Sequence, residues 1–144
     1  MATSGILVEQ LSQIISQATA PAFLLGAVAG FLSVLIGRSN RIVDRSNILT
    51  AIEDDDPVRA RMKTDIPRLK RRARLINKAI EFAVVSGVFT TCLVVVAFAS
   101  AFLGFSHAYG AAALFVLALG FFSVSLIYLW REVRISLSDL EFYG

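Results

Sequence analysis

The chain is short of the residue types on which most soluble enzymes and disulfide-bonded proteins depend. It has one cysteine, Cys92, and one histidine, His107, in 144 residues. A single cysteine excludes a disulfide framework within the chain, a CxxC redox pair and a cysteine-based zinc site. There is also no glycine-rich phosphate loop. The sequence therefore offers no catalytic residue and no metal site, and we expect a protein that is not an enzyme and needs no cofactor.

Charged residues are missing from two long stretches of the chain. They make up 17% of the sequence, whereas hydrophobic residues make up 56%, and the mean hydropathy is +0.70. The uncharged stretches cover residues 11–37 and 82–130, where only His107 has a side chain that ordinarily titrates near neutral pH. This composition is too hydrophobic for an ordinary soluble domain of this size. We therefore predict an all-α integral membrane protein.

The lengths of the two stretches predict three membrane spans. In the first stretch, apolar residues are dense only over residues 18–37. This length suits one crossing of a bilayer core about 30 Å thick. Pro21 falls near the start of this span, where its missing N–H costs little. The second stretch has 49 residues, so we divide it into spans 82–103 and 111–130 around a glycine-containing turn, 104–110. No basic residue precedes the first run, so we expect a retained span rather than a cleaved signal peptide.

The basic residues predict one orientation. All 14 lie either between Arg38 and Lys78 or at Arg131 and Arg134. The segment before the first span and the 104–110 turn carry none. The positive-inside rule therefore places the N-terminus and this turn outside, and residues 38–81 and 131–144 in the cytoplasm.

The segments outside the spans carry helical periodicity. Residues 1–17 carry the pattern of a short amphipathic helix, which suits either an outer interfacial segment or the frayed start of the first span. Apolar residues step by 3 or 4 along the 38–81 loop and into the second and third spans, so we expect the three helices to extend beyond the membrane and pack as a small bundle. The stripes are Ile42, Arg45, Leu49 and Ile52; Leu69, Ala73, Ile76, Ile80, Ala83 and Gly87; and Leu126, Trp130, Val133, Leu137 and Leu140.

The middle of the loop carries an acidic run, Glu53 to Asp56, followed by Pro57. Asp56 and Pro57 are a good N-cap and first-turn pair, so a short helix is predicted to begin there. Thr64 or Asp65 as cap and Pro67 in the first turn predict the start of the next helix. The acidic run suits a solvated turn better than a cation site, because adjacent carboxylates rarely converge on one ion.

Three segments together resemble one bacterial family. They are Pro21-Ala-Phe-Leu-Leu25 opening the first span, Arg38-Ser-Asn-Arg-Ile-Val-Asp-Arg45 leaving it, and Arg71-Arg-Ala-Arg-Leu-Ile-Asn-Lys78 entering the second. The chain resembles domain-of-unknown-function family 2721 over about residues 21–130. The resemblance implies a small protein of the bacterial cytoplasmic (inner) membrane and carries no reaction with it.

Small residues recur on one side of the first span and form a candidate helix-packing interface. Such residues let helix backbones approach closely, which is the main packing device in lipid. Two partners remain open: the second span of the same chain, through Ser86 and Gly87, or a second protomer. The first-span set, called here the small-residue face, is Ala22, Gly26, Gly30, Ser33 and Gly37.

Six arginines near the cytoplasmic ends of the first two spans are candidate contacts for anionic lipid head groups. The alternative is that they only set the topology. Nucleic acid is not expected as a partner, because no aromatic residue lies between Arg38 and Glu81 to stack on bases. The six residues are Arg38, Arg41, Arg45, Arg71, Arg72 and Arg74.

Two classes of function remain. In the first, the protein is structural, either a homo-oligomer or an accessory subunit of a membrane complex, and its partners are the bilayer and other membrane subunits. In the second, several copies surround an ion pore that prefers anions because of the basic residues at its inner mouth. Its lining would come from Ser86, Thr90 and Thr91, or from Ser33 and Asn40.

Overall fold

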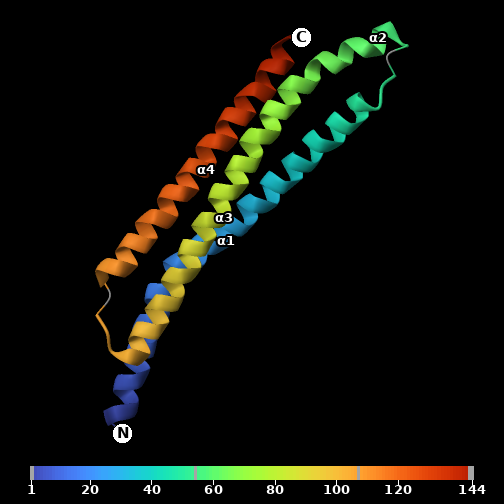
Figure 1. Cartoon of the computed structure of the whole chain (residues 1–144). Coiled ribbons are helices and arrows are strands. Elements are labelled where there is room, and N and C mark those ends of the chain that lie inside the picture. The colour runs from blue at the N-terminus through green and yellow to red at the C-terminus, as the bar shows by residue number, and fades with distance from the viewer. Residues whose placement is uncertain (1, 54, 107, 143–144) are drawn as a thin grey trace. The chain divides into compact units, whose positions relative to one another are not determined.

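The computed structural model describes residues 2–53, 55–106 and 108–142. Within these residues every regular element is helical and none is a strand. In chain order they are α1 (Ala2–Thr50), α2 (Pro57–Ala60), the 3₁₀ helix η1 (Arg61–Asp65), α3 (Ile66–Leu103) and α4 (Ala108–Phe142) (Figure 1). The helices α1, α3 and α4 each contain a segment long and apolar enough to cross a membrane. The predicted all-α architecture with three candidate spans is confirmed.

Each long helix continues past its apolar segment. α1 begins at Ala2 with no break at residue 17, so the predicted interfacial segment and the first span form one helix. Pro21 therefore lies inside a helix and not near its start, which corrects the sequence-based placement. Helix α3 begins at Ile66, sixteen residues before the expected second span. The predicted helical extensions are thus present at the ends of all three spans.

The two connections differ in how well local sequence predicted them. Asp56 caps α2 as expected, and its Oδ1 accepts hydrogen bonds from the N–H groups of Val58 and Arg59. The predicted start of the next helix is confirmed, because α3 begins at Ile66 with Pro67 in its first turn. Thr64 does not cap it, since η1 runs directly into α3 and the Thr64 hydroxyl donates to the carbonyl of Arg61. The Asp56 cap holds because it needs only its own neighbours.

The turn between α3 and α4 is shorter than predicted. Helix α3 ends at Leu103 and α4 begins at Ala108, so Gly110 is helical. Gly104 has φ +71°, a conformation that L side chains rarely adopt, and its N–H donates to the carbonyl of Ser100. This is the helix C-terminus that glycine favours. His107 lies outside the described residues, as does Asp54 of the acidic run.

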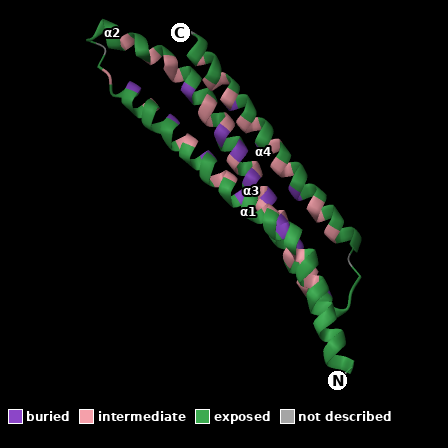
Figure 2. Cartoon of the chain, turned by 180° about the vertical axis from the view of Figure 1, so that it is seen from behind, coloured by how far each residue is buried: buried purple, intermediate pink, exposed green. Residues whose placement is uncertain are grey.

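The chain divides into two compact units. The first unit comprises residues 1–30 and 83–122, and the second comprises 31–82 and 123–144. The buried positions recur every seven residues along each helix, and Figure 2 shows them as purple bands. A seven-residue period is typical of left-handed coiled-coil packing. The series are Val28, Leu35, Ile42 and Leu49; Leu69, Ile76, Ala83 and Thr90; Ala79, Ser86, Leu93 and Ser100; and Ala118, Ser125 and Glu132.

The internal face of α4 is not the one that apolar periodicity predicted. Leu126, Trp130, Leu137 and Leu140 of the predicted stripe are exposed, whereas the buried positions are small or polar. The stripe on α3 is confirmed, with Leu69, Ile76 and Ala83 buried. The prediction failed on α4 because its apolar residues surround the helix and do not mark the side that packs.

Small residues bring α3 and α4 together within each unit. In the first unit Ser86 donates its hydroxyl to the carbonyl of Ala118 across the helix pair, at 2.7 Å. In the second unit the direction is reversed, and Ser125 donates to the carbonyl of Ala79. All four residues are fully buried. Side chains this short let a hydroxyl of one helix reach the backbone of the other.

Candidate functional site

A carboxylate from α4 joins arginines from the two other long helices in the second unit. Glu132 is fully buried, and its Oε2 accepts hydrogen bonds from Nε and Nη2 of Arg38 at 2.9 and 2.6 Å. Its Oε1 accepts one from Nε of Arg72 at 2.8 Å. The Arg38 and Arg72 side chains are 32% and 20% exposed. We call these three residues the first ionic layer; both oxygens of its carboxylate are used.

A second ionic layer lies seven residues further along α1 and α4 and four residues earlier on α3. It consists of Arg45 on α1, Arg68 on α3 and Asp139 on α4. Nη1 of Arg68 donates to Oδ1 of Asp139 at 2.7 Å. Arg45 forms no ion pair within the described part of the chain. The second layer therefore contains two arginines and one carboxylate, as the first does. Among the described residues, however, its carboxylate pairs with Arg68 alone.

A cavity of about 270 Å³ opens at the second ionic layer. We call it the arginine cavity. Three guanidinium groups and two carboxylates face it, so its charged side chains sum to +1. Such a site suits an anion with several acceptor oxygens, since guanidinium groups bind carboxylate and phosphate through paired hydrogen bonds. Its lining residues are Arg45, Asp65, Arg68, Leu69, Arg72 and Asp139.

The predicted lipid-binding arginines occupy different environments. Arg38 and Arg72 bind Glu132, Arg45 lines the arginine cavity, and Arg41, Arg71 and Arg74 are exposed. No local sequence pattern separates them, and Glu132 was not among the predicted site residues. The clue was available in the spacing, because Glu132 lies seven residues after Ser125 and seven before Asp139.

One exposed ion pair marks the start of the predicted second span. Nζ of Lys78 donates to Oε2 of Glu81 at 2.8 Å. This hydrogen bond, together with the charge of Glu81, raises the pKa of Lys78 above its usual value. Lys78 therefore remains protonated at every physiological pH. Both side chains are more than half exposed, so the pair contributes little stability.

The small-residue face of α1 has no partner among the described residues. All five of its residues are exposed. A Cβ placed on Gly26, Gly30 or Gly37 would meet no atom within 4 Å outside its own helix. At about 100° per residue, the buried Val28 and Leu35 lie about 180–200° from Gly26. The face thus points away from the buried side of α1.

The small and hydroxyl residues of α3 serve contacts within the chain. Ser86 faces α4, and Gly87 faces Val28, whose Cγ1 would lie 3.6 Å from an added Cβ. Thr90 is fully buried, and its hydroxyl donates to the carbonyl of Ser86 at 2.8 Å. Of these four residues only Thr91 is exposed, and its hydroxyl donates to the carbonyl of Gly87. Thr90 is therefore enclosed within the chain.

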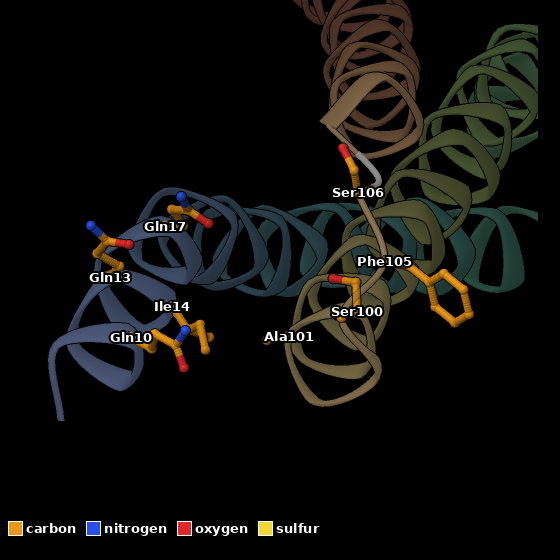
Figure 3. Close-up of a pocket in the computed structure, with 9 residues that line it drawn as sticks. Gln10, Gln13, Ile14, Gln17, Ser100, Ala101, Phe105 and Ser106 are labelled. Carbon is orange, nitrogen blue, oxygen red and sulfur yellow. The ribbon is translucent and has the colours of Figure 1, made fainter. Parts of the chain in front are cut away.

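Two cavities adjoin in the first unit. One, of about 380 Å³, is bounded by the glutamines of α1 and by the end of α3 with the turn that follows (Figure 3). The other, of about 430 Å³, shares Gln17, Phe105 and Ser106 with it and reaches apolar residues such as Pro21 and Leu93. The described lining carries no charged side chain.

The comparison with protein families gives one match. The model described as "Protein of unknown function (DUF2721)" matches residues 18–142. The chain belongs to the DUF2721 family. No curated protein and no solved structure matches it. The resemblance inferred from the three sequence segments is confirmed. The matched range of this DUF2721 protein also contains the residues of both ionic layers.

Proposed function

We propose that this DUF2721 protein is a non-enzymatic structural protein of the bacterial inner membrane that assembles with copies of itself. The observation that carries the proposal is the small-residue face of α1, which lies opposite the helix's internal side and meets no partner in the described part of the chain. Without a hydrophobic driving force between helices in lipid, close backbone approach at small residues is what favours association.

The face is complementary to itself. A shallow apolar hollow of about 600 Å³ lies over Ala22, Gly26 and Ala27, with Thr19 and Phe23 at its edges. The Phe23 side chain beside it is 77% exposed. A two-fold contact between identical helices can place Phe23 of each copy in the hollow of the other, because such an interface uses the same patch twice. A second copy is therefore the occupant that we propose.

Crosslinking at Gly26 tests the assembly. In a Cys92→Ala background, Gly26→Cys should form a disulfide-linked dimer in oxidised membranes, because helices that cross at glycines bring their Cα atoms within disulfide range, about 4.4–6.8 Å. Ala20→Cys is the matched control, since this exposed residue lies about 120° around α1 from Gly26. Gly26→Leu and Gly30→Leu should abolish the native dimer on gels, whereas Ala20→Leu should preserve it.

Equal crosslinking at Ala20 and Gly26, or none at Gly26, would contradict the self-association. The latter result would leave the role of an accessory subunit, in which a different membrane protein covers the face. An ion pathway has less support. The hydroxyls of Ser86 and Thr90 that would line it are enclosed and bonded to backbone carbonyls of the same chain.

The orientation is a separate prediction. The basic residues favour an N-terminus and a 104–110 turn outside, with residues 38–81 and 131–144 in the cytoplasm. Cysteines replacing Ser4 or Ser106 in a Cys92→Ala background should react with an impermeant thiol reagent in intact cells, and a cysteine replacing Ser138 should react only after lysis. Reaction at Ser138 in intact cells would reverse the topology.

A further inference from the structure

The carboxylates of the two ionic layers differ by one methylene group. Asp139 stands where the first layer has Glu132, seven residues earlier on α4, and Arg45 stands where the first layer has Arg38, seven residues earlier on α1. The longer Glu132 reaches arginines of both neighbouring helices. The shorter Asp139 reaches only Arg68. The arginine cavity lies where the missing contact to Arg45 would be.

The donors around the arginine cavity are only partly used. Arg72 reaches Glu132 through Nε, and its two terminal nitrogens make no further hydrogen bond to the described residues. The guanidinium group of Arg45 forms no hydrogen bond or ion pair with the described residues. Asp65 lines the same cavity and forms no ion pair with the described residues, so it does not neutralise Arg45. Arg68 and Arg72 are meanwhile held in place by Asp139 and Glu132, which pre-organises them.

We propose that the arginine cavity binds a phosphate group. Its oxygens supply the acceptor that Arg45 lacks in the second ionic layer, just as Glu132 supplies one carboxylate oxygen to each arginine of the first layer. Phosphate offers several acceptor oxygens to the guanidinium groups of Arg45 and Arg72. The phosphate comes either from a soluble ion or from the head group of an anionic lipid, since basic pockets between helices at the cytoplasmic side bind such head groups. This binding site is independent of the proposed self-association.

Titration of the purified full-length protein with inorganic phosphate tests the site. In neutral detergent at constant ionic strength, phosphate should raise the thermal midpoint relative to chloride. Arg45→Gln should weaken binding about tenfold or more, because it removes charge-assisted hydrogen bonds. Arg41→Gln is the matched control: Arg41 is exposed, lies one turn away on α1 and does not line the cavity. Its affinity should stay within about twofold of wild type.

Asp139→Glu is the sharper variant, because it keeps the charge and lengthens the side chain by the one methylene group in which the layers differ. The longer carboxylate should reach Arg45, fill the cavity and weaken phosphate binding about tenfold or more while the protein becomes more heat-stable. Bilayer discs of phosphatidylcholine with or without phosphatidic acid identify the source. Stabilisation by phosphatidic acid that inorganic phosphate does not reproduce indicates a lipid head group, and the reverse indicates the soluble ion.

Three outcomes would overturn the proposal. The first is a wild-type protein that responds to neither inorganic phosphate nor phosphatidic acid. The second is an Asp139→Glu variant that binds phosphate as tightly as wild type, since the longer carboxylate should occupy the Arg45 donors that phosphate needs. The third is an Arg41→Gln variant that loses as much affinity as Arg45→Gln, which would indicate general surface electrostatics.

Discussion

Replacing Glu132 by alanine should destabilise the folded protein by about 3–5 kcal/mol, the cost of removing one partner from a buried ion pair. Glu132 is fully buried and accepts three hydrogen bonds from two arginines. Without it, Arg38 and Arg72 are left close together with no anion between them. Because these arginines come from α1 and α3, their repulsion acts on the packing of all three long helices in the second unit.

Thermal unfolding in a neutral detergent, followed by circular dichroism, measures this effect. Glu141→Ala is the matched control, because Glu141 is an exposed carboxylate on the same helix, and its midpoint should not change. Replacing the whole first ionic layer at once, with Arg38→Met, Glu132→Leu and Arg72→Met, should recover most of the lost stability, since no unpaired charge remains. A Glu132→Ala protein that unfolds at the wild-type temperature would show that the layer does not hold these helices.

Leu49→Ala should lower stability by about 2–5 kcal/mol, as expected for a large side chain removed from a packed core. Leu49 is 1% exposed and lies near the end of α1, twelve residues beyond the predicted first span. Its burial shows that the extension of α1 packs and does not project freely into solvent. The cavity left by alanine would remove the contacts that hold the end of α1 in the second unit.

The neighbouring Ile48 provides the control for Leu49. It is 62% exposed at the same distance along α1, so Ile48→Ala should change stability by less than about 0.5 kcal/mol. Denaturant unfolding of both variants in the same detergent gives the comparison. If the two substitutions cost the same, the helical extensions do not form the packed bundle described here.

The sequence by itself determined the class of protein, the number of candidate spans, one helix start and one helix end. Two uncharged stretches sufficed for the spans, since crossing a bilayer needs about 20 apolar residues whatever they pack against. Asp56 and Gly104 marked a helix start and a helix end because capping depends on neighbouring backbone groups alone. The apolar stripe on α3 was predictable because charged residues occupy its other side as far as Glu81.

Only the tertiary structure decided which side of α4 packs and which arginines meet a carboxylate. In the membrane the surrounding lipid is as apolar as the protein core, so Leu126 and Trp130 can face outward at no cost. Hydrophobic periodicity therefore does not indicate which side of the helix packs. The internal side of α4 is instead marked by Ser125 and Glu132, whose polar groups need partners supplied by other helices. Glu132 is paired because Arg38 and Arg72, 94 and 60 residues away in the chain, are brought to it by packing. No local pattern specifies a contact of that kind, because it depends on the register in which three separate helices align.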